Sequence, residues 1–306
     1  MLKLAWAGSR RKIARARSLS AVAYSFARTP DTSDIQDPMR PPTLASVHLM
    51  RRPRRRRSTR LHTRWQTRYT PTVPPIQIAF LTFTFTGPLL LWILSRHLAS
   101  VRFSKGICWF FALAMLSAKI GTTIAVWREG NLTADYALPM HLCDWALIAT
   151  VLALTLRWQL CFELAYFWGL AGTAQALITP ALDSPDFWRI FAFFTVHAGI
   201  PASVLWLIFD FKLRPQRGAW LRVALWSQLY IAVTLAVNAA TGGNYGFLTD
   251  RPAVHSMLDL FSDPHGPRRW LYVLEIDLTG LLFCFLLGLP WQIARWKSSR
   301  RTAEAR

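Results

Sequence analysis

The chain has 306 residues and a formal net charge of +20, and its composition is 53% hydrophobic and only 17% charged. Residues 1–75 hold 17 of the 36 Lys and Arg residues and three acids, whereas the rest of the chain alternates long uncharged stretches with short charged ones. Helices of soluble proteins need polar faces, so uncharged stretches of about twenty residues indicate membrane spans and exclude a soluble globular enzyme.

The first 75 residues predict a basic, disordered segment. They include the run Arg54–Arg57 and too few apolar residues to offset the entropy lost on ordering. Such a run can bind anionic lipid or nucleic acid. A solvated tail, or a start codon assigned too far upstream, is the simpler interpretation, so we expect no specific nucleic-acid partner. The segment lacks the continuous apolar stretch of a conventional signal peptide.

Seven apolar segments follow, each close to the length of a bilayer crossing. They are Ile76–Ser95, Gly106–Trp127, Met140–Leu156, Trp158–Thr179, Trp188–Phe211, Trp220–Ala239 and Trp270–Ile293. Tryptophans such as Trp158, Trp188 and Trp220 lie at segment ends, as interfacial anchors do. Residues 76–294 therefore predict an all-α, multi-pass membrane bundle of about seven transmembrane helices, followed by a basic cytoplasmic tail at 295–306.

The charges between the segments predict the orientation of the bundle. With seven crossings, the loops after the first, third and fifth segments share a side with the C-terminus. That side holds thirteen basic residues: Arg96, Arg102, Lys105, Arg157, Lys212, Arg214, Arg217, Arg222, Arg295, Lys297, Arg300, Arg301 and Arg306. The opposite loops hold five: Arg128, Arg189, Arg251, Arg268 and Arg269. The positive-inside rule then places the C-terminus in the cytoplasm and the protein in the cell membrane. The same rule disfavours an external segment 1–75, so either this segment is absent from the mature protein, which we favour, or the number of spans differs by one.

The unusual polar residues converge on the non-cytoplasmic half of the predicted bundle. They are His141, Cys143 and Asp144 in the third segment, Gln175 in the fourth, His197 in the fifth, Asn238 in the sixth, Asn244 and Tyr245 just beyond it, and Glu275 and Asp277 in the seventh. Ionisable groups within membrane spans face a polar cavity or one another. A shared cavity lined by these residues is the simplest explanation. Lys119 in the second segment could pair with an acid or extend its ammonium group to an interface, and we expect the second arrangement.

Cys143 is the most reactive candidate in this set. It lies in the first turns of a helix, where the helix dipole favours a thiolate. His141 is two residues away and points to a different side of a regular helix, so His197 is the better candidate base for a Cys–His acyl-transfer site. Buried packing cysteines and histidines that bond across the bundle are the structural alternative. The other cysteines, Cys108, Cys161 and Cys284, show no metal-ligand or disulfide spacing, and we expect no metal or cofactor.

An ordered series of motifs carries a family resemblance: LPMHLCDWA, FWGLAGTAQALITP, FFTVHAG and GGNYGFLTDRP, from residue 138 to residue 252. Over roughly Ile76–Trp291 the chain resembles the bacterial YwaF-like integral membrane family, which implies a bacterial plasma membrane. It is distantly similar to the transmembrane protein 164 family, which is implicated in moving acyl chains between phospholipids with a cysteine nucleophile. That resemblance implies that Cys143 is the nucleophile, that His197 is the base, and that membrane phospholipids are the substrates.

The leading hypothesis is therefore a lipid acyltransferase or lipid hydrolase. Asn238, Asn244 or Gln175 would donate hydrogen bonds to the developing oxyanion. A transporter or small-molecule-binding membrane protein would use the same cavity without covalent chemistry, although no internal repeat supports transport. A structural scaffold also remains open. A retinal-binding receptor is rejected because the seventh segment, Trp270–Ile293, has no lysine for a Schiff base.

Overall fold

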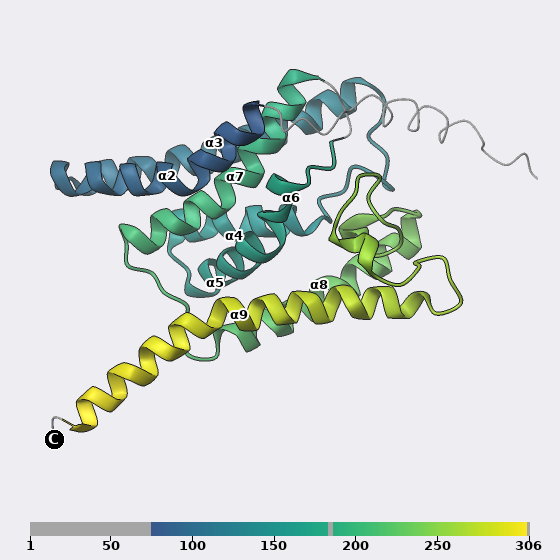
Figure 1. Cartoon of the computed structure of the whole chain (residues 1–306). Coiled ribbons are helices and arrows are strands. Elements are labelled where there is room, and N and C mark those ends of the chain that lie inside the picture. The colour runs from purple at the N-terminus through teal and green to yellow at the C-terminus, as the bar shows by residue number, and fades with distance from the viewer. Residues whose placement is uncertain (1–74, 183–185, 305–306) are drawn as a thin grey trace, which may run out of the picture. The chain divides into compact units, whose positions relative to one another are not determined.

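The structure is a computed structural model that describes residues 75–182 and 186–304, and it is helical, with no strand in that part of the chain (Figure 1). The described residues belong to one compact unit, Arg57–Arg306. Five helices are long and apolar enough to cross a bilayer: α2 (Pro75–Leu98), α3 (Val101–Arg128), α7 (Phe187–Phe209), α8 (Ala219–Thr241) and α9 (Arg269–Glu304). The predicted all-α membrane bundle is confirmed. The predicted basic segment lies outside the described residues except for Pro75.

The third and fourth predicted segments form shorter helices. The third is α4 (Leu142–Leu156), and the fourth is divided into α5 (Gln159–Trp168), the π-helical turn η1 (Gly169–Thr173) and α6 (Gln175–Ile178). Each of the seven predicted segments thus coincides with one helix or one run of helices. Residues 295–304, which the sequence separates as a tail, continue helix α9.

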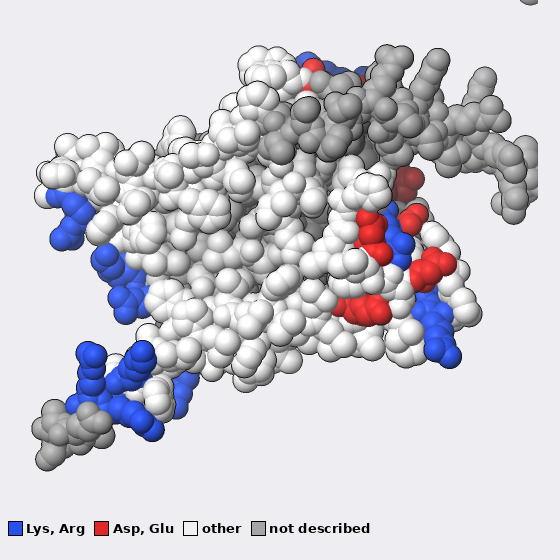
Figure 2. Space-filling view, viewed as in Figure 1, with Lys and Arg blue, Asp and Glu red and all other residues white. Residues whose placement is uncertain are grey.

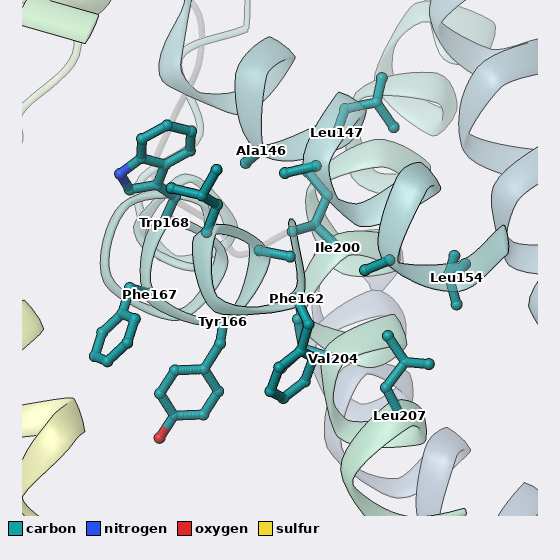
Figure 3. Packing of buried hydrophobic residues seen from close by; sticks show 14 of the residues in the cluster. Ala146, Leu147, Leu154, Phe162, Tyr166, Phe167, Trp168, Ile200, Val204 and Leu207 are labelled. Carbon is teal, nitrogen blue, oxygen red and sulfur yellow. The ribbon is translucent and has the colours of Figure 1, made fainter. Parts of the chain in front are cut away.

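Helix α7 occupies the centre of the bundle. Of its most apolar 18-residue window, 72% is buried, against 17–22% in the other four long helices, whose apolar faces are left for lipid. Ile200, Val204 and Leu207 of α7 pack against side chains of α4 and α5 (Figure 3). A glycine permits the closest approach, because a Cβ added to Gly169 would lie 2.8 Å from the Ile200 side chain.

The two ends of the bundle differ in their connections. One end, called here the basic end, holds the connections from α2 to α3, from α4 to α5 and from α7 to α8. At the other, the loop end, lie the connections from α3 to α4, from α6 to α7 and from α8 to α9, of which the first and third are longer than those at the basic end. Figure 2 shows Lys and Arg gathered toward the basic end and most of the acidic side chains at the loop end. The connection between α8 and α9, residues 242–268, is called the connecting loop.

Candidate functional site

Helix α4 begins within the bundle rather than at its surface. Its Asp144 forms an ion pair with Lys119 of α3, and Lys119 lies nine residues, or about 13 Å, before the last residue of α3, Arg128. The start of α4 is held by a capping bond in which the His141 backbone N–H donates to the Asp144 carboxylate at 3.2 Å. The short third segment is therefore explained by a connection that descends into the bundle before the helix starts.

Two tyrosine hydroxyls form hydrogen bonds with backbone groups of the connection between α3 and α4. The Tyr245 hydroxyl accepts from the Leu138 N–H and donates to the Ala134 carbonyl, both at 2.9 Å. The Tyr230 hydroxyl donates to the Met140 carbonyl at 3.2 Å. Irregular backbone at membrane depth is tolerated only where its polar groups find partners in the protein. Tyr245 therefore has a structural role beside its predicted role in substrate binding.

Asn238 anchors the connecting loop over this region. Its side-chain amide donates to the Tyr245 carbonyl at 3.0 Å and accepts from the Tyr245 N–H at 2.8 Å. The next residue, Gly246, donates its N–H to Nδ1 of His141 at 3.4 Å. Both polar atoms of Asn238 are thus engaged with backbone, which leaves one N–H of its amide nitrogen unbonded among the described residues, and its predicted oxyanion role stays a prediction.

The buried charge at the start of α4 is paired across the bundle. The Lys119 Nζ atom lies 2.5 Å from Oδ1 of Asp144, whose side chain is only 5% exposed, whereas the Lys119 side chain is 38% exposed. Of the two arrangements predicted for Lys119, the structure shows pairing with an acid and not the favoured extension to an interface. Its ammonium group meets a carboxylate instead, because such a pair lowers the cost of holding either charge in a membrane.

The two histidines present opposite hydrogen-bonding atoms to the site. His197 Nδ1 lies 2.7 Å from the Phe193 carbonyl. A carbonyl only accepts, so Nδ1 carries the proton, and Nε2 of the neutral ring is left as an acceptor. His141 Nδ1 accepts the Gly246 N–H, so its neutral ring carries the proton on Nε2. Only His197 therefore offers a ring nitrogen that can take a proton.

Cys143 is half-buried on the first turn of α4, between His141 and Asp144. It lies within Coulombic range of Lys119 and Asp144. The same two charges reach the His197 ring, which is only 9% exposed. No hydrogen bond joins the Cys143 sulfur to either histidine ring in this structure. The structure thus gathers Cys143, Lys119, Asp144 and the histidines without forming the predicted dyad contact.

The other predicted site residues have no hydrogen bond to Cys143 among the described residues. The Asn244 amide oxygen accepts from the Thr249 hydroxyl at 2.8 Å and from the Asp250 N–H at 3.0 Å, which shapes the connecting loop. Glu275 accepts from Ser262, Asp277 accepts from Gln228, and the half-buried side chain of Gln175 has no hydrogen-bond partner among the described residues. Their roles in substrate binding stay predictions. No group of three His, Cys, Asp or Glu side chains in the described part of the chain could hold a metal ion.

A groove of about 710 Å³ lies between α2, α3 and α7. This volume is within the range of about 300–1,000 Å³ that is typical of ligand sites. Small and aromatic side chains line most of it, and Asp186 and Arg189 lie at the loop end. Its lining includes Ala118 and Ala198, which directly neighbour Lys119 and His197 in the sequence. The groove therefore borders the polar cluster through shared turns of α3 and α7.

Pairing of Lys119 with an acid was one of its two predicted arrangements, but neither Asp144 as the partner nor the position of Tyr230 was predicted. A lysine in an apolar segment was itself the signal, since an intramembrane charge predicts a partner of opposite sign. Tyr230 carried no such signal, because tyrosine is common in membrane helices and only the fold places it within range of Cys143 and Asp144.

The sequence profile of the TMEM164 family matches residues 68–288 of the 306, which include all the helices described above up to Gly288 of α9. The chain belongs to the TMEM164 family. No curated protein and no solved structure matches it. The predicted resemblance to that family is confirmed, while the YwaF-like bacterial label stays a prediction. Cys143, His197 and Lys119 all lie inside the matched range of this TMEM164-family membrane protein.

Proposed function

We propose that this TMEM164-family chain transfers acyl groups from membrane phospholipids through a thioester on Cys143. The observation that supports this most is the gathering of an intramembrane thiol, a histidine with an available Nε2 acceptor and a Lys–Asp pair at the start of α4. Family membership and the apolar groove beside the cluster agree with a lipid substrate.

The reaction divides into two balanced steps. The Cys143 sulfur attacks the ester carbonyl carbon, and its proton passes to Nε2 of His197. The carbon–oxygen bond then breaks, and the departing lysophospholipid hydroxyl takes that proton. An acceptor hydroxyl next attacks the thioester, gives its proton to His197, and the proton returns to the Cys143 sulfur as the thiol leaves. Water as the acceptor would make the same site a hydrolase.

The base must approach the thiol for the first step. His197 and Cys143 are not hydrogen-bonded in this structure, and catalytic hydrogen bonds in unliganded enzymes are often long. We propose that a bound lipid chain in the neighbouring groove moves α7 and α4 enough to complete the contact.

The Cys143→Ala variant tests the proposal. Purified protein in lipid nanodiscs is mixed with a phospholipid that carries a labelled acyl chain, and label on protein and on acceptor lipid is followed. We expect wild type to form a thioester on Cys143 that hydroxylamine removes, and Cys143→Ala to lose transfer. Cys161→Ala is the matched control, because Cys161 is also a half-buried helical thiol but has no charged neighbour. Transfer by Cys143→Ala at the wild-type rate would rule the mechanism out.

The orientation is also proposed from the charges of the connections. The basic end would face the cytoplasm with the C-terminus of α9, and the site would open toward the outer leaflet. Labelling a single introduced cysteine in the connecting loop with an impermeant maleimide on intact cells tests this. Labelling only after the cells are broken would invert the orientation.

A binding or transport role is the second candidate, and the missing bond between Cys143 and a histidine favours it. The Lys119–Asp144 pair and the groove would then hold a ligand without covalent chemistry. In the same nanodisc assay this candidate predicts that Cys143→Ala still binds phospholipid and that wild type forms no thioester.

A further inference from the structure

The proposed acyl transfer places negative charge on the carbonyl oxygen of the ester, and that oxygen needs a hydrogen-bond donor. The amides predicted for this task bond to the connecting loop or to no described residue. Asn238 is bonded through both polar atoms to Tyr245, and Asn244 is bonded through both to Thr249 and Asp250, which leaves each amide nitrogen one further N–H. No hydrogen bond among the described residues joins Asn238, Asn244 or Gln175 to Cys143, Asp144 or Lys119.

Lys119 is connected to the nucleophile through a single residue. Its Nζ atom bonds Asp144, which follows Cys143 directly in the first turn of α4. An ammonium group has three donors, and the bond to Asp144 is the only hydrogen-bonding or ionic contact of Nζ among the described residues. The Lys119 side chain is also far more exposed than the carboxylate that holds it, at 38% against 5%. Lys119 therefore keeps donors for a further oxygen ligand near the first turn of α4, which carries Cys143.

The surroundings strengthen such a contact. Charge interactions are much stronger in a water-poor interior than in water, and a fixed cation needs no reorganisation when charge develops on the substrate. The Asp144 carboxylate holds the ammonium in place, and Asp144 is itself fixed by the backbone N–H of His141. A lysine positioned in this way is suited to an anionic transition state.

We propose that Lys119 is a catalytic residue that stabilises the tetrahedral oxyanion of the acyl-transfer reaction, and that Asp144 is the residue that positions it. This inference rests on the proposed function. As the Cys143 sulfur bonds to the carbonyl carbon, the carbonyl electron pair moves to oxygen, and Lys119 donates a hydrogen bond to that oxygen while keeping its proton. When the carbon–oxygen single bond breaks, the pair returns and the hydrogen bond weakens.

The test compares the acylation rate of Cys143 in single-turnover experiments with labelled phospholipid in nanodiscs. Lys119→Met/Asp144→Asn removes both charges together, so no unpaired charge is left, and the introduced asparagine side chain keeps an acceptor for the cap. We expect the acylation rate to fall about 100- to 1,000-fold, as for loss of one oxyanion donor, with phospholipid affinity changed only a few-fold. Asp144→Asn alone retains the cation, and we expect a loss of about ten-fold or less.

Two further variants keep the result interpretable. Glu163→Gln/Arg222→Met removes the charges of a different buried pair, at the basic end, and should leave the acylation rate of the folded protein unchanged. If Lys119→Met/Asp144→Asn does not give monodisperse protein, Lys119→Gln/Asp144→Asn replaces it, because the two amides can bond to each other. That variant should still lose at least about ten-fold.

The outcomes separate this inference from the proposed function. A wild-type protein that forms no thioester on Cys143 overturns both. A wild-type thioester together with a near-normal acylation rate in Lys119→Met/Asp144→Asn overturns the role of Lys119 alone. In that case a loss in Gln175→Leu would identify Gln175 as the donor.

Discussion

Two buried ion pairs hold the bundle, and they differ in how completely their hydrogen-bonding capacity is used. At the basic end, both oxygens of Glu163, a fully buried carboxylate, accept from Arg222 at 2.8–3.0 Å. Glu163 also accepts from the Gln159 amide and the Gln216 N–H, both at 2.9 Å. This pair therefore ties α5 to α8 and to the connection between α7 and α8.

The Lys119–Asp144 pair is sparse by comparison. It has one close contact, its carboxylate has one further backbone donor, and it lies near a thiol and two histidines. The cations of both pairs are partly exposed, with side chains 38% exposed for Lys119 and 41% for Arg222. A saturated pair is suited to holding helices in one arrangement. A pair with spare donors costs stability to keep in a membrane and is the expected form of a functional site. The difference indicates structure at the basic end and chemistry at the start of α4.

The largest effect on stability is expected from Arg222→Met. Glu163 is fully buried, so removing its cation leaves an uncompensated charge, which costs about 3–5 kcal/mol. Thermal unfolding in nanodiscs should show a clearly lowered midpoint, while the acylation rate per folded molecule stays near wild type. A small stability loss, or a specific loss of acylation, would contradict the division of roles between the two pairs.

A smaller effect on stability is expected from Gly246→Ala in the connecting loop. Gly246 has φ +66°, and an added Cβ would lie 2.6 Å from the Tyr230 hydroxyl, so strain of about 1–3 kcal/mol and displacement of the loop are expected. Hydrogen exchange in residues 242–248 should rise, and acyl transfer should fall because Gly246 holds His141. Gly242→Ala is the matched control, since its φ of +75° is similar but its added Cβ meets no atom within 4 Å. Equal effects of the two substitutions would show that the Tyr230 contact is unimportant.

The smallest effect concerns Asp259 in the connecting loop. Its pKa is lowered from 3.8, first by the Ser256 N–H and then by His255. A depressed carboxyl pKa stabilises the folded loop above pH 3.8, and this contribution is lost as the pH falls below that value. The protection of residues 256–260 against hydrogen exchange, corrected for the pH dependence of intrinsic exchange, should therefore fall between about pH 5 and about pH 3. Asp259→Asn should show lower protection at about pH 5 and little further change, whereas an unaltered pH response in that variant would assign the effect to another group.

Much of the fold could be predicted because each membrane helix is specified locally. An apolar run of bilayer length has one favourable environment, so the segments around Ile200 or Cys284 are recognised from their own residues. The division of the fourth segment by the turn Gly169–Thr173 could not be predicted, since it depends on how closely α5 approaches α7. Among the predicted site residues, His141, Cys143 and His197 lie near one charged pair, whose two partners were not predicted together. Their catalytic roles stay predictions.

The sequence by itself determined that the chain is a multi-pass helical membrane protein with its unusual polar residues toward one end. Because consecutive spans run in opposite directions, the sequence assigns each residue to one end of the bundle without knowledge of the packing. Only the tertiary structure decided which polar groups remain available, because a hydrogen bond depends on neighbours that are distant in sequence. Asn238 is bonded to the backbone of Tyr245 in the connecting loop, whereas Lys119 bonds Asp144 on the first turn of α4 and keeps further donors there. The proposed oxyanion donor is therefore the intramembrane Lys119 and not one of the amides that the sequence predicted.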